Sequence, residues 1–302
     1  MISLVVHGGA WDIPDDLAEP HKKGVANALR AGWEILKGGG SAVDAVERAV
    51  VLMEDDVTFN AGKGSFLNAS GEVELDASIM DGRTFRAGAV AAVQNIRNPI
   101  RLARKIMEES EHVLLVGMGA TRFARENGIK TCDPDFLITA RELERWRKLQ
   151  VDAKYTTKDS FRRKNLPSDT VGAVAMDGEG NIVAGTSTGG TPNKYPGRVG
   201  DSPLIGCGTY ADNAVGGVST TGWGEAIIKT VMAKTVIDLM ELNGKDPAEA
   251  VEEGLRILQR KAAGFGGIIA LNHTGKIAVT YNTPRMARAY MTAEMKTPFV
   301  AV

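Results

Sequence analysis

The sequence predicts an α/β chain of the α+β kind, built as a four-layer αββα sandwich in which helices cover two mainly antiparallel sheets. Both halves of the chain mix short apolar runs, which are typical of strands, with longer amphipathic segments, which are typical of helices. Many of the apolar runs are joined by short glycine-bearing turns, and such turns favour antiparallel hairpins. A doubly wound parallel sheet is the alternative.

Composition narrows the classes of function. The chain has 302 residues, of which 43% are hydrophobic and 24% charged, as in soluble globular proteins. A net charge of −1 gives no sign of a nucleic-acid or membrane partner, and no run of 18 apolar residues is present. Cys132 and Cys207 are the only cysteines, so neither a disulfide framework nor a cysteine-based metal site is expected. The apolar run 1–6 lacks the basic flank of a signal peptide, and we expect a cytoplasmic protein.

The N-terminal half begins with a predicted strand over 3–7. A helix over about 20–37 follows and ends at a run of three glycines, 38–40. Ser41 is a good N-cap for a second helix, and Thr139 forms a capping-box pattern with Glu142 for a later one. The elements predicted here are helices over 42–54, 99–109, 117–126 and 140–149, and strands over 71–81, 86–93 and 112–116.

The C-terminal half begins after segment 150–169, which is charged and is predicted to be a mobile linker. A basic binding site is the alternative interpretation of its lysines and arginines. The elements predicted after it are strands over 170–176, 181–188, 204–209 and 215–221, helices over 225–242 and 247–261, and a closing hairpin of strands 267–271 and 276–281.

The hairpin 170–188 is the centre of the functional prediction. When it is folded about Glu179, Thr170 lies directly opposite Thr188. Opposed residues on one face of an antiparallel pair have Cβ atoms ~5 Å apart. One hydroxyl therefore begins a strand directly after the linker, with a second hydroxyl beside it.

Other short motifs have the wrong context. Gly117-Met-Gly119 follows a strand, but the third glycine of a dinucleotide fingerprint is replaced by Arg122. The G-x-S-x-G pattern around Ser187 is followed by Pro192 and Pro196, where a nucleophile elbow requires a helix. The four histidines show no zinc-ligand spacing.

A threonine becomes a good nucleophile when a base lies beside it, and an N-terminal threonine has its own α-amine for that purpose. An unperturbed α-amine has a pKa near ~8, so part of it is neutral at pH 7. We therefore expect the chain to cleave itself between Asp169 and Thr170, giving chains 1–169 and 170–302 of a single domain. The hydroxyl of Thr170 would attack the Asp169 carbonyl to form an ester, which water then hydrolyses.

Several long motifs in order carry a resemblance that covers nearly the whole chain. The sequence resembles the plant-type asparaginase and isoaspartyl-peptidase family of N-terminal-nucleophile (Ntn) hydrolases. The motifs are His7-Gly-Gly-Ala10, Gly40-Ser-Ala-Val-Asp-Ala-Val46, Phe59-Asn-Ala-Gly62, Asp76-Ala-Ser-Ile-Met-Asp-Gly82, Thr170-Val-Gly-Ala-Val174, Thr186-Ser-Thr-Gly-Gly190, Gly197-Arg-Val-Gly-Asp-Ser-Pro203 and Thr221-Gly222.

The resemblance implies roles for particular residues. Thr170 matches the nucleophile and Thr188 the threonine that supports it. Arg198 and Asp201 match the clamp for the substrate's α-carboxylate and α-ammonium groups, chemistry that an arginine fork and a carboxylate suit. Thr221 and Gly222 match the family's oxyanion positions and, with Gly224, its substrate-binding positions, and Asn60 matches an additional catalytic group.

The resemblance also implies a structural sodium ion held by backbone carbonyls, and no cofactor for catalysis. Carbonyl oxygens suit a hard cation. The matching positions are Met53, Glu54, Asp56, Phe59, Ala61 and Lys63. Two residues depart from the family pattern: Asp169 stands where many members have glycine, and Trp223 stands where a smaller or more polar residue is common.

The implied function is hydrolysis of the side-chain amide of L-asparagine and of β-aspartyl (isoaspartyl) peptides, through an acyl-enzyme on Thr170. The resemblance further implies a dimer of cleaved units, an (αβ)2 heterotetramer. One alternative is a glycosylasparaginase-like amidase. Another is an uncleaved homologue with only a binding role.

Overall fold

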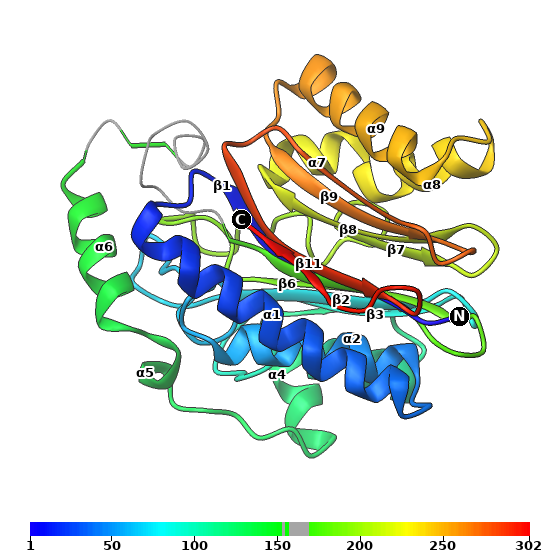
Figure 1. The fold of residues 1–302 in the computed structure, drawn as a ribbon. Helices are drawn as coiled ribbons and strands as arrows, with labels where there is room; N and C mark the ends of the chain where they lie inside the picture. Colours follow the sequence, from blue (N-terminus) through cyan, green and yellow to red (C-terminus); the bar gives the residue numbers. More distant parts are fainter. Residues whose placement is uncertain (153–154, 157–168) are drawn as a thin grey trace.

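Two sheets lie face to face with helices on both outer surfaces, in the computed structural model of residues 1–152, 155–156 and 169–302 (Figure 1). This confirms the predicted αββα sandwich. The linker predicted over 150–169 falls for the most part outside the described residues. No described helix combines the length and the apolar character needed to cross a bilayer.

The larger sheet has the strand order β12-β11-β1-β5-β6-β2-β3-β4. Its strands are β1 (Ser3–Trp11), β2 (Leu75–Asp81), β3 (Arg86–Val93), β4 (Leu114–Val116), β5 (Val171–Met176), β6 (Ile182–Thr188), β11 (Arg285–Thr292) and β12 (Phe299–Ala301). The smaller sheet has the order β10-β9-β8-β7, with β7 (Thr209–Asp212), β8 (Gly216–Gly222), β9 (Gly266–Asn272) and β10 (Ile277–Tyr281). Among the paired strands of the described chain only β3 and β4 run parallel, so the doubly wound alternative is wrong.

Helices form the two outer layers. Those packed on the larger sheet are α1 (Asp15–Lys37), α2 (Ala42–Asp55), α3 (Pro99–Glu109) and α4 (Gly117–Glu126). Those packed on the smaller sheet are α7 (Gly224–Thr230), α8 (Met232–Glu241) and α9 (Pro247–Ala262). Two further helices, α5 (Pro134–Leu137) and α6 (Ala140–Gln150), lie at the side of the sandwich (Figure 1).

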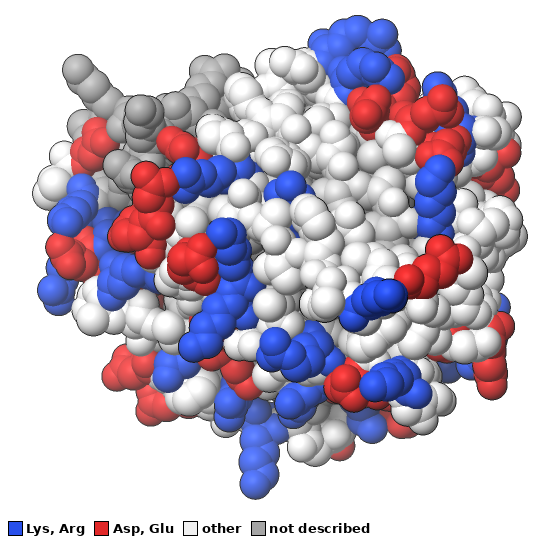
Figure 2. Space-filling view, in the orientation of Figure 1, with Lys and Arg blue, Asp and Glu red and all other residues white. Residues whose placement is uncertain are grey.

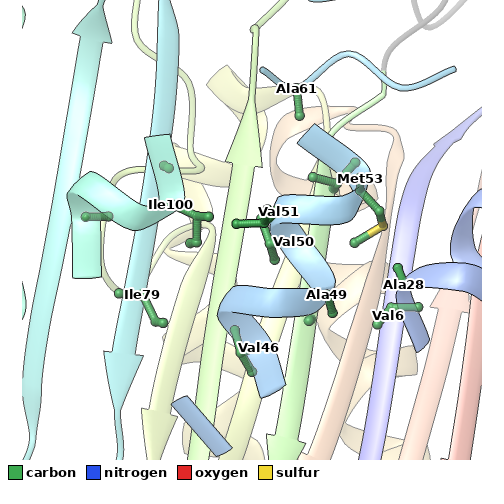
Figure 3. Packing of buried hydrophobic residues seen from close by; sticks show 14 of the residues in the cluster. Val6, Ala28, Val46, Ala49, Val50, Val51, Met53, Ala61, Ile79 and Ile100 are labelled. Atoms are coloured by element: carbon green, nitrogen blue, oxygen red, sulfur yellow. The ribbon is translucent and has the colours of Figure 1, made fainter. Parts of the chain in front are cut away.

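The hydrophobic core consists of three clusters, each of which lies between two adjacent layers of the sandwich. One apolar cluster joins the larger sheet to its helices, and Figure 3 shows Ala49 and Met53 of α2 on the side toward Val6 of β1. A second cluster joins the smaller sheet to α7–α9. A third lies between the sheets and includes Val174 of β5. Because both faces of β5 and β6 are covered, these two strands form a fixed base for the residues at their ends.

Three sequence predictions about elements are wrong. The helix predicted over 225–242 is broken at Val231, whose φ of 44° is left-handed. The strand predicted over 204–209 is replaced by β7, which begins at Thr209. The hairpin 267–281 is not the last element of the chain, because β11 and β12 follow it and β11 pairs with β1.

The register of the central hairpin is as predicted. Val171 of β5 pairs with Ser187 of β6, so Thr170 lies opposite Thr188 at the end of the ladder. β1 pairs with β5 on one side of the hairpin and β2 pairs with β6 on the other, so the hairpin lies in the interior of the larger sheet.

Candidate active site

Thr170 and Thr188 form the centre of a small buried cavity. The Thr170 hydroxyl donates to the Thr188 hydroxyl over 3.2 Å, and both residues are buried. The cavity has a volume of only about 10 Å³, enough for about one water molecule. It is lined by Thr170, Thr188, Gly190, Thr191, Arg198, Gly200, Asp201, Ser202 and Gly222.

The bond before Thr170 is enclosed as well. Asp169 is 4% exposed and packs against Gly9, where a β-carbon would lie 2.6 Å from its Oδ1 atom. Gly9 has a φ of +92°, so the close approach and the backbone conformation both require glycine there. The Oδ2 atom of Asp169 lies 3.5 Å from Nε2 of His21 on α1.

A buried histidine also lies beside the hairpin. His7 of β1 pairs with Gly172 of β5, and its Nε2 atom lies 2.9 Å from the Ser219 hydroxyl. Burial lowers the pKa of His7 to about 3, although the Thr170 backbone acts in the opposite direction. His7 is therefore neutral at pH 7.

Arg198 and Asp201 come together on the loop after β6, as their spacing suggested. Arg198 Nε donates to Glu225 Oε1 over 2.9 Å, and its Nη2 atom is buried without a hydrogen-bond partner in the described residues. Burial acts to lower the pKa of Arg198, but the hydrogen bond and charge of Glu225 outweigh it and the pKa is raised. Burial raises the pKa of Asp201 to about 6, partly offset by the Thr220 hydroxyl 3.0 Å away. A cation that entered beside Asp201 would favour its ionised form.

Gly224 touches both clamp residues. A β-carbon there would lie 2.8 Å from Arg198 Nη2 and 3.1 Å from Asp201 Oδ1. A side chain at this position would displace Arg198 or Asp201. Glycine at position 224 therefore provides the space in which these two side chains lie.

The predicted oxyanion residues lie at the end of β8. Gly222 lines the cavity, whereas Thr221 is fully buried beside it and does not line it. The Thr221 hydroxyl has no hydrogen-bond partner within the described residues. Other buried side-chain atoms of the described residues, among them the Thr191 and Ser202 hydroxyls of the cavity lining, also lack a partner.

Asn60 lies behind the cavity rather than in its lining. Its amide donates to Gly190 O over 2.7 Å and accepts from Phe66 N over 2.8 Å, and its carbonyl accepts from Gly189 N. These bonds hold the turn that follows Thr188, so Asn60 stabilises that turn.

The predicted sodium loop closes on itself. Lys63 N donates to Glu54 O over 2.8 Å, which brings its ends together. Gly62 has a φ of +55°, and a β-carbon there would lie 2.5 Å from Glu54 O. The carbonyls of Met53 and Asp56 each accept one backbone hydrogen bond, from Asp56 N and Phe59 N. Because a carbonyl has two lone pairs, each of these two oxygens can accept one more interaction.

Three residues at the site were not predicted from the sequence. Glu225 holds Arg198, and its position just after the glycine-rich turn 222–224 was the available signal. Lys194 is fully buried and donates to Glu74 O over 2.9 Å, in the loop that carries Arg198. His21 faces Asp169 from another element. Ser187, in contrast, lies within β6 and donates to Glu54 Oε1, so it is not on a nucleophile elbow, as the sequence context predicted.

The chain is similar to known proteins over nearly its whole length. The sequence model of the asparaginase family matches residues 1–300. The chain is 49% identical to the isoaspartyl peptidase/L-asparaginase of Bos taurus over 284 residues, which cover 94% of this chain and 91% of that protein. It is 47% identical to the protein of that name from Homo sapiens, with coverage of 94% and 91%, and 46% identical to that from Xenopus laevis, with coverage of 95% and 91%.

Proposed function

Because this chain belongs to the asparaginase family, whose members are Ntn hydrolases, we propose that it hydrolyses the side-chain amide of L-asparagine and of isoaspartyl peptides after cleaving itself before Thr170. The observation that carries the proposal is the buried pair of threonine hydroxyls, 3.2 Å apart, beside Arg198 and Asp201. The relatives named above supply the substrate class.

Self-cleavage comes first. The Thr170 hydroxyl attacks the Asp169 carbonyl carbon, a C–O bond forms, and the C–N bond of the peptide breaks. The Thr170 nitrogen keeps its proton and gains the one that leaves the hydroxyl, so it becomes a primary amine. Water then hydrolyses the ester to the α-carboxylate of Asp169 and the free hydroxyl of Thr170. The cavity of about 10 Å³ is too small for a substrate in the uncut chain, which supports an order in which self-cleavage precedes substrate binding.

Substrate hydrolysis follows with the same hydroxyl. The freed amine takes the proton of Thr170 as the hydroxyl attacks the side-chain carbonyl of the substrate. Arg198 holds the substrate's α-carboxylate and Asp201 its α-ammonium group, so the side-chain amide faces Thr170. The Thr221 hydroxyl and the Gly222 N–H stabilise the oxyanion of the tetrahedral intermediate. The amine of the amide leaves, and water releases aspartate from Thr170.

One experiment tests both steps. Purified wild-type protein is incubated, its intact mass is measured, and L-asparagine and an isoaspartyl dipeptide are assayed. We expect two chains that join at 169/170, and activity that grows with the cleaved fraction. Thr170→Ala should remain full length and inactive. A full-length wild-type chain that is active would contradict the mechanism.

The alternatives differ in measurable ways. A glycosylasparaginase-like amidase would hydrolyse a glycosylated asparagine in preference to the isoaspartyl dipeptide. A protein with only a binding role would give no fragment beginning at Thr170. Charges of both signs are interspersed on the face shown in Figure 2, which supports small substrates over a nucleic acid. The cytoplasmic location stays a prediction.

The closed loop 53–63 supports a structural sodium ion held by the backbone carbonyls of Met53, Glu54, Asp56, Phe59, Ala61 and Lys63. The ion would hold the loop in its closed form and takes no part in catalysis. Thermal unfolding in sodium chloride and in tetramethylammonium chloride of equal ionic strength tests this. We expect a higher Tm with sodium, and equal values would contradict it.

The (αβ)2 assembly also remains a proposal. β4 is an edge strand of the larger sheet, and exposed apolar side chains gather there and at the start of α4: Val113, Leu114, Val116 and Met118. An exposed apolar edge is an aggregation hazard that a second copy would cover. Light scattering should give twice the mass of one cleaved unit, and Met118→Asp should lower it.

A further inference from the structure

His21 has no role in the steps above, yet it is fully buried beside the bond to be cut. It lies on α1, and its Nε2 atom is 3.5 Å from Oδ2 of Asp169. Its Nδ1 atom lies 2.7 Å from the Leu17 carbonyl oxygen. A carbonyl only accepts hydrogen bonds, so Nδ1 carries a hydrogen. A neutral ring would then present a bare Nε2 lone pair to a carboxylate, and the contact is favourable only when the ring is an imidazolium.

Asp169 has few other partners among the residues that the structure describes. Its Oδ1 atom is buried without a hydrogen-bond partner in the described residues, and its backbone lies against Gly9. The His21 ring is fixed by edge contacts with Trp11 and Phe59, at centroid distances of 6.0 and 5.3 Å. His21 is therefore a cation on a fixed helix, and it faces the carboxylate of Asp169. Asp169 is also the residue whose carbonyl the Thr170 hydroxyl attacks.

We propose that His21 is a positioning residue for self-cleavage, which holds the Asp169 side chain and so fixes the carbonyl of residue 169 against the Thr170 hydroxyl. The inference rests on the self-cleavage step of the proposed function. It assigns His21 no contact with the substrate and no role after the chain is cut.

Loss of the pair should slow cleavage for a definite reason. A buried carboxylate without its cation is unfavourable, so the side chain of Asp169 would turn toward water. The carbonyl of the same residue would move with it. A displacement of about 1 Å in a reacting group can cost roughly 10²-fold in rate, so we expect His21→Gln to slow cleavage by about ten- to a hundred-fold.

Glycine at position 169 removes the carboxylate and so gives a matched control. The four chains are wild type, His21→Gln, Asp169→Gly and the double variant, made by a short pulse of cell-free synthesis. The fraction cleaved is followed with time by intact mass, and Tm is measured for each chain. We expect His21→Gln to slow cleavage only when Asp169 is present, so the double variant should cleave at the rate of Asp169→Gly. Once fully cleaved, His21→Gln should have the wild-type kcat for L-asparagine.

Each other outcome has a distinct meaning. A wild-type cleavage rate in His21→Gln would overturn the inference and leave the proposed function intact. Equal slowing in both backgrounds would assign His21 to helix packing alone and would also overturn it. If His21→Gln is insoluble, Asp169→Asn tests the pair from the other side, and a wild-type rate in that variant would overturn it. A wild-type chain that never cleaves would remove the proposed function and this inference together.

Discussion

The buried hydroxyl of Thr221 gives a prediction for a single residue. Thr221→Val keeps the volume and removes a hydroxyl that has no partner within the described residues. Because no hydrogen bond is lost, Tm should not fall. If the hydroxyl donates to the oxyanion, kcat for L-asparagine should fall by about 10²–10³-fold. Self-cleavage, followed by intact mass, should persist.

Thr235→Val is the matched control, because it also removes a threonine hydroxyl. That hydroxyl donates to the Thr230 carbonyl oxygen over 2.8 Å, within the α7–α8 region. We expect a lower Tm and an unchanged kcat. If both variants kept wild-type turnover, Thr221 would have no part in the reaction.

Residues could be paired from the sequence only where their contact is local. Thr170 and Thr188 belong to one hairpin, so counting from the turn was enough to place them opposite each other. Arg198 meets Glu225, and His21 meets Asp169, only because separate elements pack together. No local pattern encodes such contacts. The same limit explains why Asn60 was expected in the cavity and instead braces the turn behind it.

At the scale of elements, the apolar pattern predicted one helix where there are two. The pattern runs through Val231 without a glycine or proline, so the sequence gives no stop signal. The break lets the first turn of α8 bond elsewhere, since Ala233 N donates to Cys207 O and Lys234 N to Gly206 O. Packing against the loop before β7 therefore overrides the helical pattern.

Val231 itself should be strained. A β-branched residue with a φ of 44° is unusual, and the left-handed region costs roughly 1–2 kcal/mol for such residues. Glycine avoids that cost but loses about 0.5–1 kcal/mol through the entropy of the unfolded chain. We expect Val231→Gly to raise stability by up to about 1 kcal/mol, which differential scanning calorimetry would detect as an increase of a few degrees in Tm. Leu242→Gly, at an exposed position with right-handed helical backbone, should lower Tm.

At the scale of the whole molecule, the buried His7 links stability to pH. Its pKa is lowered to about 3 in the folded chain, against ~6.5 when unfolded. Between these values the unfolded chain binds a proton that the folded chain does not, so this contribution to stability is lost as pH falls from about 6.5 toward 3. Buried Asp201 and Glu54, with pKa values raised to about 6 and about 8, give the opposite slope.

Comparison of variants separates these effects. In the single-chain Thr170→Ala background, His7→Asn should reduce the loss of stability on acidification by up to ~1.4 kcal/mol per pH unit, which is one proton. Denaturant titrations between pH 7 and pH 5 measure this. The exposed His112→Asn is the control and should leave the slope unchanged. An unchanged slope in His7→Asn would mean that His7 is not held neutral by the fold.

The order of strands in the larger sheet has a consequence for the cleaved protein. The segment before Thr170 supplies β1, β2, β3 and β4, and the segment after it supplies β5, β6, β11 and β12. In the order β12-β11-β1-β5-β6-β2-β3-β4, strands of the two segments alternate in blocks. The ladders β11–β1, β1–β5 and β6–β2 therefore each join one segment to the other.

Separation of the cleaved chains would require all three ladders to break and the core between the sheets to be exposed. We therefore expect chains 1–169 and 170–302 to stay together at nanomolar concentration, and to part only in denaturant. Size-exclusion chromatography at high dilution, followed by mass spectrometry under native and denaturing conditions, measures this. A native peak that contains only one of the two chains would mean that the sheet does not hold its strands in this order.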